Sequence, residues 1–340
     1  MPSPKAAAAE WAAYLALRAG VGLLNVFEID DVLAGARGVG SLMYRLDRRH
    51  RVRGRANLRR CLPDLEPAEI DRAVERSMQH LIQLGAEVMF TPRLVSFDSW
   101  PRRVRLNHLQ PALRVMLDDR PTVLVTGHFG NWELLGYVLA TVGLDLDAVA
   151  RPIDNPLVNR WLLGVRQRQG MRIITKWGAS DRMARVMESG GMLGFIGDQN
   201  AGDRGMFVPF FGRLASAYKS IGLLAMKYRA PVICGYARRI NDRFEYELGA
   251  TDIIEPDDWA DQPDPLYYLT ARYARAIETM VRRAPDQYLW VHRRWKSRPR
   301  FEREGKPMPA SIRAKLEALP WMTDEQMAEL EKPVLDANPK

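Results

Sequence analysis

The sequence predicts an α/β fold, with a mixed, largely parallel sheet flanked by helices and an N-terminal helical segment that associates with a membrane. Two observations indicate this class. From residue 121 onward, short apolar runs alternate with helical segments, an order typical of βαβ units whose helices cover both faces of a sheet. Before residue 61, two apolar segments with helical character are followed by a basic stretch.

The N-terminal apolar segments cover residues 11–27 and 32–44, and the basic stretch covers 45–60. A membrane-spanning helix needs about 20 apolar residues, whereas the first segment is shorter and is interrupted by Arg18 and Asn25. We therefore expect two helices that lie on or dip into a membrane surface, followed by arginines that face anionic headgroups. Two ordinary core helices with a solvated basic face are the alternative. No secretory signal is expected.

A long helix is predicted from residue 67 onward. Glu66 and Pro67 are typical of a helix start, and the apolar residues that follow repeat with the helical period of about 3.6. Pro92 is expected to end this helix, because proline has no backbone N–H to donate.

The remaining elements follow from apolar runs bounded by turn residues. We expect strands at 121–126, 146–151, 172–175, 192–197, 232–237, 244–248 and 288–291. We expect helices at 133–142, 155–169, 179–188, 215–228, 264–283 and 322–331. The two strands joined through residues 239–243 are expected to form an antiparallel hairpin. The chain then divides into residues 1–60 for membrane association, an α/β domain over 61–300 and a C-terminal tail over 301–340.

Composition excludes several classes of protein. Of 340 residues, 47% are apolar and 27% are charged, which is globular and excludes a disordered, collagen-like or disulfide-stapled chain. Cys61 and Cys234 are expected to be free thiols. The net charge of +9 is concentrated, because residues 45–60 carry +7 and residues 292–306 carry +5. Such patches indicate an anionic partner: lipid headgroups, an acidic protein, a phosphorylated substrate or nucleic acid.

Common catalytic motifs are absent from the chain. There is no G-x-S-x-G, no G-x-x-x-x-G-K-[ST] and no H-E-x-x-H. The five histidines and two cysteines are scattered, so we expect no metal site. No cofactor is expected either.

Residues 127–133, GHFGNWE, carry the strongest chemical signal. They lie where a predicted strand ends and a helix begins, the edge at which open α/β sheets bind ligands. His128 can take a proton from a hydroxyl, and Glu133 can hydrogen-bond the imidazole and stabilise its charged form. Backbone N–H groups of residues 129–131 can hold a developing oxyanion. No serine or cysteine lies beside His128, which favours direct attack by a substrate hydroxyl. A purely structural histidine is the alternative.

The H-x-x-x-x-E motif within GHFGNWE resembles the bacterial lipid A biosynthesis (lauroyl/myristoyl) acyltransferase family, part of the wider lysophospholipid/glycerolipid acyltransferase group. Further segments resemble that family in the same order: Asn57-Leu58 with Leu62-Pro63, Ala150-Arg151-Pro152 with Asn155-Pro156, Gly197-Asp198-Gln199-Asn200 with Phe207 to Gly212, and Leu289 to Lys296. The resemblance covers roughly residues 10–300. Tyr218 and Lys219 depart from the small residues usual in the family, and are expected to reshape the acyl or acceptor pocket.

The resemblance implies O-acyl transfer from an acyl thioester to a hydroxyl of a membrane lipid, such as a lipid A precursor or a related glycolipid. It implies that His128 is the general base and Glu133 its orienting partner. The residues implied in substrate binding are Asn131, Arg151, Asp198, Gln199, Arg213, Arg293, Arg294 and Lys296. Asp198 and Arg151 are also expected at this edge because each lies at the carboxyl end of a predicted strand.

The implied partners are an acyl-acyl carrier protein or acyl-CoA donor, the lipid acceptor and an anionic membrane surface, and not nucleic acid. The implied location is the cytoplasmic face of the bacterial inner membrane. Two other functions are compatible with the residues alone. One is a non-catalytic module that binds an anionic membrane or nucleic acid, and the other is a thioester hydrolase in which the His–Glu pair activates water.

Overall fold

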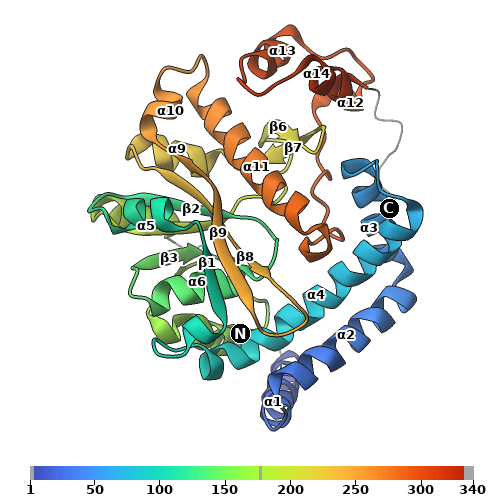
Figure 1. Cartoon of the computed structure of the whole chain (residues 1–340), viewed down its shortest axis with the longest axis vertical. Coiled ribbons are helices and arrows are strands. Elements are labelled where there is room, and N and C mark those ends of the chain that lie inside the picture. Colours follow the sequence, from blue (N-terminus) through green and yellow to red (C-terminus); the bar gives the residue numbers. More distant parts are fainter. Residues whose placement is uncertain (1–3, 176–177, 333–340) are drawn as a thin grey trace.

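An open, seven-stranded sheet forms the centre of the computed structural model, which describes residues 4–175 and 178–332 (Figure 1). Its strands are β1 (Val104–Asn107), β2 (Thr122–Thr126), β3 (Leu146–Val149), β4 (Arg172–Ile174), β5 (Met192–Ile196), β8 (Val232–Arg239) and β9 (Tyr246–Ile254). Their order is β1-β9-β8-β2-β5-β3-β4. All neighbours pair in parallel except β8 and β9, which are antiparallel. The predicted mixed, largely parallel sheet and its antiparallel hairpin are therefore confirmed.

Helices cover both faces of this sheet. They are α4 (Pro67–Leu94), α5 (Gln110–Leu117), α6 (Trp132–Thr141), α7 (Pro156–Arg166), α8 (Ala179–Glu188), α9 (Lys219–Lys227), α10 (Pro256–Ala260) and α11 (Pro265–Arg283). Strand β2 shows the division, because successive side chains of a strand point to opposite faces. Val123 and Val125 pack in one core with residues of α9 and α11, while Leu124 packs in another with residues of α5 and α6.

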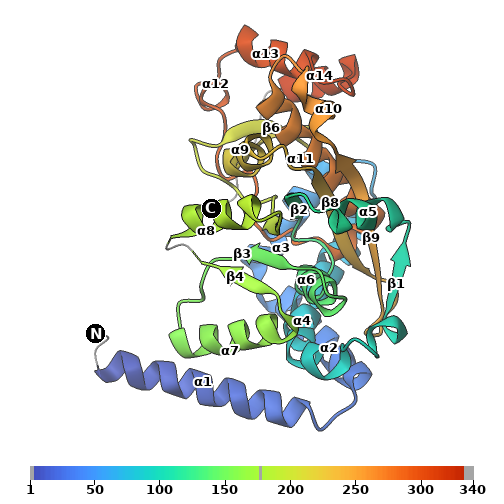
Figure 2. The same cartoon turned by 90° about the vertical axis from the view of Figure 1, so that its left-hand side faces the viewer.

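Before α4, the chain forms helices α1 (Pro4–Leu24), α2 (Ile29–Leu46) and α3 (Arg48–Cys61). Helix α2 packs on α4 and buries Ile29 and Leu33, whereas α1 runs beside α7 along one edge of the molecule (Figure 2). Trp11 and Leu15 of α1 are more than half exposed. None of the described helices is long and apolar enough to span a bilayer.

The predicted basic stretch folds as helix α3, and part of its charge is directed into the protein. Arg53 is buried and donates to the Val291 carbonyl at 3.3 Å, and Arg55 pairs with Asp71. Arg51 donates to two carbonyls at the end of α2. The arginines of this stretch that remain exposed are Arg45, Arg48, Arg49 and Arg59.

Two predicted elements are wrong. Residues 215–217, expected in a helix, belong to β7 (Arg213–Ala217), which pairs with β6 (Met206–Phe210) in a separate antiparallel hairpin. The hairpin closes at Phe211 and Gly212, both with positive φ, and its small side chains are completely buried. The expected strand 288–291 is irregular and makes one isolated bridge, between Phe129 and Tyr288.

Other differences lie at the ends of elements and in short elements. Pro92 lies in the last turn of α4, where it removes only one helical hydrogen bond, so the helix continues to Leu94. Strand β1 and helix α5 were not expected, because β1 is a short edge strand that buries only Val104. The tail contains α12 (Arg300–Arg303) and α13 (Ala310–Glu317) besides α14 (Asp324–Glu331), which matches the predicted helix 322–331.

Candidate active site

His128 and Asp198 are brought together by the pairing of the two central strands. Strands β2 and β5 are parallel, with Thr126 opposite Ile196, so the residues two positions beyond each strand lie side by side. His128 Nδ1 is 2.7 Å from Asp198 Oδ1, and the His128 backbone N–H donates to Asp198 Oδ2 at 2.9 Å. One carboxylate therefore holds both the main chain and the ring of the histidine.

The electrostatics of the pair make the imidazole a stronger base and keep the carboxyl group ionised. Burial disfavours a charge on His128, but the adjacent Asp198 carboxylate outweighs this and raises the pKa of the imidazole. Burial likewise opposes ionisation of Asp198, yet hydrogen bonds and the charge of His128 lower the pKa of the carboxyl. An ionised carboxylate can only accept, so Nδ1 donates, and no described residue hydrogen-bonds Nε2. Nε2 is thus the nitrogen free to take a proton.

Two aromatic side chains flank the His128 ring. His292 stacks on it with 5.3 Å between ring centroids and 21° between planes, and Trp132 meets it edge-on at 5.1 Å. Burial lowers the pKa of His292, which keeps this second imidazole neutral near pH 7. Asn57 of α3 donates to the carbonyl oxygens of Trp290 and His292, so an N-terminal helix holds the segment that carries His292.

Glu133 is not the partner of His128, which corrects the predicted His–Glu hydrogen bond. Its carboxylate accepts two hydrogen bonds from Arg166 of α7, at 2.8 and 2.5 Å. The reason lies in the turn between β2 and α6, which places Glu133 in the first turn of the helix, facing α7. Asp198 lies beside His128 Nδ1 instead, because the parallel pairing of β2 with β5 places it there.

Gly130 forms the tight part of this turn. Its φ is +57°, and a Cβ there would lie 2.0 Å from the Ala237 carbonyl oxygen, so only glycine fits. The Gly130 N–H donates to the Gln287 carbonyl at 3.0 Å, and the Asn131 N–H donates to the Ala237 carbonyl at 2.8 Å. The prediction that these two N–H groups hold an oxyanion is therefore wrong, because the fold already uses both.

Asn131 also has a structural position rather than the predicted one in substrate binding. It is 1% exposed, its Oδ1 caps α6 by accepting from the Leu134 N–H, and its Nδ2 donates to Glu87 of α4 at 2.8 Å. Glu87 is completely buried and also accepts from Arg239 and Tyr246. A buried ion pair thus supports the turn that presents His128.

His80 of α4 supports the same turn from another side. It is buried, and its Nε2 lies 3.0 Å from the Gly130 carbonyl oxygen. Burial and the nearby Arg239 cation lower the pKa of His80 to about 3. The ring is neutral at pH 7, so Nε2 donates to the Gly130 carbonyl.

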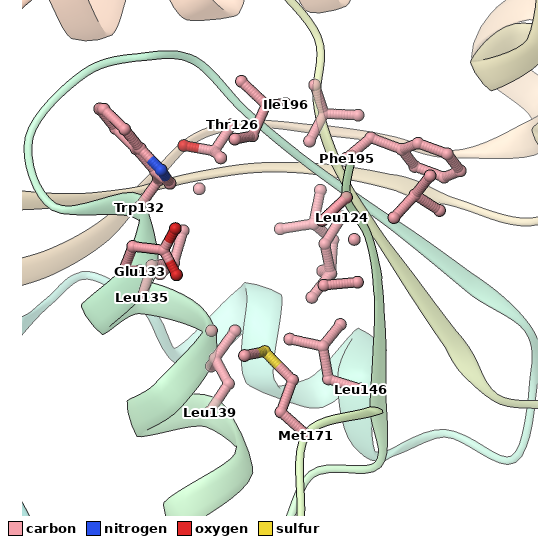
Figure 3. Close-up of a pocket in the computed structure, with 18 of the residues that line it drawn as sticks. Leu124, Thr126, Trp132, Glu133, Leu135, Leu139, Leu146, Met171, Phe195 and Ile196 are labelled. Atoms are coloured by element: carbon pink, nitrogen blue, oxygen red, sulfur yellow. The ribbon is translucent and has the colours of Figure 1, made fainter. Parts of the chain in front are cut away.

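An apolar pocket begins at this turn and extends between the sheet and α6 (Figure 3). The empty space between its lining residues, including the solvent at its open side, is about 840 Å³. Thr126, Trp132 and Glu133 lie at one end, and Leu139, Leu146 and Met171 lie at the other. Thr126 Oγ1 is buried and has no hydrogen-bond partner among the described residues. Tyr218 and Lys219, expected to reshape the pocket, do not line it, because they lie at the start of α9.

Two of the predicted substrate-binding arginines are engaged within the protein. Arg294 is 2% exposed and donates to the carbonyls of Ser216 and Gln199, so it joins β7 to the loop after β5 rather than contacting substrate. Arg213 lies on β7, half-buried beside Arg298; burial and its cationic neighbours lower its pKa to about 10. The structure does not bring Arg213 to the pocket.

The other predicted residues are accessible at the edge where the strands end. Arg151 follows β3 and its side chain is 88% exposed. Gln199, next to Asp198, is exposed, as is Lys296, and Arg293 is partly exposed. These four residues do not line the apolar pocket, but their exposure leaves them accessible to a molecule bound at the surface.

Sequence reasoning missed the contributions of Arg166, His292 and Thr126. Thr126 is the last residue of a predicted strand at the binding edge, and His292 lies within a segment that resembles the family, so both carried a signal. Arg166 carried none, because its pairing with Glu133 depends on how α7 packs beside α6. No group of three His, Cys, Asp or Glu side chains with the geometry of a metal site occurs in residues 4–175 and 178–332. Cys61 and Cys234 are free and buried, and burial raises the pKa of both thiols.

Fold and site together define an α/β protein with a histidine–aspartate pair at the carboxyl ends of its central strands, beside a deep apolar pocket. Comparison with known proteins then identifies its family. The family model for bacterial lipid A biosynthesis acyltransferase matches residues 6–297, so the chain belongs to this family and is an acyltransferase.

Individual relatives agree with this assignment. The chain is 26% identical over 272 residues to the lipid A biosynthesis lauroyltransferase of Escherichia coli strain K12, covering 77% of this chain and 84% of that protein. It is 26% identical over 269 residues to the lipid A biosynthesis palmitoleoyltransferase of that strain, covering 77% and 83%. Among solved structures, the 1-acyl-sn-glycerophosphate acyltransferase PlsC from Thermotoga maritima matches with a TM-score of 0.34 and 14% identity, over 61% of this chain and 82% of that one.

Proposed function

We propose that this acyltransferase moves a fatty acyl group from a thioester, carried by acyl carrier protein or coenzyme A, to a hydroxyl of a lipid A precursor or a related glycolipid. Family membership supports acyl transfer to a lipid. The observation that carries the chemistry is the His128–Asp198 pair, because the His128 ring packs against Trp132, which lines one end of an apolar pocket.

His128 is the general base of the proposed reaction. Nε2 takes the proton of the acceptor hydroxyl while its oxygen attacks the thioester carbonyl carbon, and Asp198 stabilises the imidazolium that forms. The C–S bond then breaks, and the leaving thiolate recovers the proton from Nε2. The histidine returns to its starting state, and no covalent enzyme intermediate is required.

The pocket binds the acyl chain in this proposal. Its lining is almost entirely apolar, and burial of each methylene of the chain stabilises the complex by about 0.8 kcal/mol. The thioester carbonyl then lies at the end formed by Thr126, whose buried hydroxyl has no partner among the described residues and can donate to the carbonyl oxygen. Glu133 and Arg166 form the polar rim, where their ion pair fixes α7 against α6.

Exposed cations at the same edge suit the anionic parts of both substrates. We assign this role to Arg151, Arg293 and Lys296, with Gln199 as a neutral hydrogen-bonding group. Carrier protein and coenzyme A are both anionic, so such an edge attracts either donor.

We further propose that the enzyme lies on the cytoplasmic face of the inner membrane. Helices α1 and α2 expose large apolar side chains, including Trp11, Leu15, Leu23, Leu42 and Leu46. Insertion of such side chains, aided by exposed arginines of α3, is the pattern of a peripheral or monotopic protein.

Acyl transfer from purified acyl-acyl carrier protein and acyl-CoA into a bacterial lipid extract tests the function, with products identified by mass spectrometry. We expect acylated lipid with the native protein and none with His128→Ala. His108→Asn is the matched control, because His108 is an exposed histidine that does not itself line the pocket, and asparagine tolerates its positive φ. Release of free fatty acid without acylated lipid would instead identify a thioester hydrolase.

A further inference from the structure

A second groove lies between α1 and α7, outside the acyl pocket. The empty space between its walls, including the solvent at its open side, is about 870 Å³. Trp11, Tyr14 and Arg18 line it from α1, with spacings of three and four residues that place them on one side of that helix. The opposite wall comes from α7 and the short 3-10 helix that follows it (Gln167–Gln169), and Pro92 of α4 completes the lining. The residues of this wall are Leu157, Arg160, Trp161, Gly164, Val165 and Arg168.

The groove is cationic and aromatic. Arg18, Arg160 and Arg168 are exposed, and none of them forms an ion pair with a described residue. Arg18 donates to the Tyr14 hydroxyl at 3.1 Å, which holds its guanidinium next to an aromatic ring. No acidic residue is among the described residues that line the groove. Three exposed guanidinium groups around one depression create a positive potential that favours an anionic ligand.

We propose that this groove binds the phosphate group of an anionic membrane lipid, with the glycerol or sugar part of the headgroup against Trp11 and Trp161. Guanidinium groups suit phosphate because they donate two parallel hydrogen bonds. Tryptophan and tyrosine suit the level of the headgroups because each has an apolar body and a polar end.

The surroundings of the groove favour a lipid over an acidic protein. Trp11 is 53% exposed and Leu15 is 59% exposed on the same helix. The groove arginines therefore lie next to an apolar surface that can enter the acyl-chain region of a bilayer. Helix α1 lies along the lower edge in Figure 2, with α7 directly beside it, so this edge meets the bilayer and the sheet lies away from it. Helix α7 then contacts a headgroup on one side while Arg166 holds the pocket rim on the other.

Vesicle flotation of the full chain tests the proposal. Vesicles of phosphatidylcholine alone are compared with vesicles that also contain phosphatidylglycerol. The groove variant carries Arg18→Gln, Arg160→Gln and Arg168→Gln. The control variant carries Arg102→Gln, Arg185→Gln and Arg204→Gln, which removes the same charge from exposed arginines on other elements that likewise form no ion pair with a described residue.

The groove variant is expected to lose about tenfold or more of its affinity for the anionic vesicles, since each arginine at such a surface contributes appreciably to binding. The control variant is expected to show a fold-loss of affinity for the anionic vesicles that is less than half that of the groove variant. Equal losses in the two variants overturn the proposal, because they show attraction to net charge alone. Loss of acyl carrier protein binding by the groove variant, with unchanged vesicle binding, also overturns it in favour of a protein partner.

A soluble probe separates a lipid site from a site for free phosphate. Dihexanoyl phosphatidylglycerol below its micelle concentration is titrated calorimetrically, with inorganic phosphate in a parallel experiment. Saturable binding of the lipid that is absent from the groove variant supports the site. Binding of inorganic phosphate with equal affinity overturns the assignment to a lipid headgroup.

Discussion

Asp198 accepts the hydrogen bond from His128 Nδ1 across 70 residues of sequence, while Glu133, only five residues beyond the histidine, pairs with Arg166. The parallel pairing of β2 with β5 produces this arrangement. Substitutions of the two carboxylates are therefore expected to have different effects on activity, although the sequence motif alone does not distinguish their roles.

Asp198→Asn is expected to lower kcat by about a thousandfold, because an amide neither fixes the required tautomer nor stabilises the imidazolium. The dependence of activity on pH is also expected to change, in a direction that follows from the pKa of His128. Asp198 raises the pKa of His128, and a base is inactive when protonated, so activity of the native enzyme falls as the pH decreases through that raised value. Loss of the carboxylate lowers this pKa, so the acid limb of kcat/KM should move to lower pH.

Glu133→Gln is the matched comparison for that profile. Its carboxylate bonds Arg166, so activity is expected to fall through a displaced pocket rim while the acid limb stays in place. An acid limb that moves in Glu133→Gln and stays fixed in Asp198→Asn would assign the partner of His128 to residue 133 instead.

Thr126→Val tests the hydroxyl at the mouth of the pocket. Valine has nearly the same shape and removes only the donor, so we expect kcat to fall by about tenfold or more with little change in KM. Thr126→Ser keeps the hydroxyl and should retain most of the activity. Steady-state kinetics with one acyl donor distinguish the variants, and an unchanged kcat in Thr126→Val excludes the proposed contact.

Met171 lies at the far end of the apolar pocket and is expected to limit the acyl chain. Met171→Ala should shift donor preference toward longer chains, whereas Met171→Phe should shift it toward shorter ones. The alanine change is also expected to destabilise the fold by about 2–5 kcal/mol, because Met171 is 4% exposed. Competition between acyl donors of different length measures the preference, and identical preferences in both variants would locate the chain elsewhere.

His80 makes the stability of the turn depend on pH. Its pKa is about 3 in the folded protein, and the unfolded value is about 6.5. Between these values the unfolded chain binds a proton that the folded chain excludes, so the free energy of unfolding falls as the pH decreases. The contribution approaches about 1.4 kcal/mol per pH unit.

His80→Gln keeps a donor for the Gly130 carbonyl and removes this titration. Urea unfolding at several pH values between 6.5 and 4 should therefore give a shallower loss of stability in the variant. Parallel curves for the two proteins contradict a buried neutral His80.

Glu87→Gln tests the buried support of the active-site turn. Arg239 is 5% exposed, and removal of its partner leaves a buried cation unpaired, so we expect destabilisation of about 3–5 kcal/mol. Glu255→Gln, which breaks the partly exposed pair with Arg120, is the control and should cost about 1 kcal/mol or less. Similar denaturation midpoints for the two variants would show that the Glu87 pair is not essential to the turn.

The fold class and most strands of the main sheet can be predicted from the amino-acid sequence alone. Apolar runs such as 192–197 and 232–237 predict buried strands because each is short, continuous and bounded by turn residues. It also located His128 at a strand end. The hairpin β6–β7 was not predicted, because Leu214, Ala215 and Ala217 are as compatible with a helix as with a strand. These residues form a strand because they pair with β6 and are buried.

Which side chains contact one another at the site depends on the tertiary structure. Spacing along the chain assigns Glu133 to His128, whereas the register of β2 with β5 places Asp198 there. Arg294 belongs to a basic run in the sequence, but in the fold it is buried and its guanidinium donates to a backbone carbonyl. The physical reason is the same in both cases: local patterns specify the backbone of an element, while contacts between distant residues depend on strand order and helix packing.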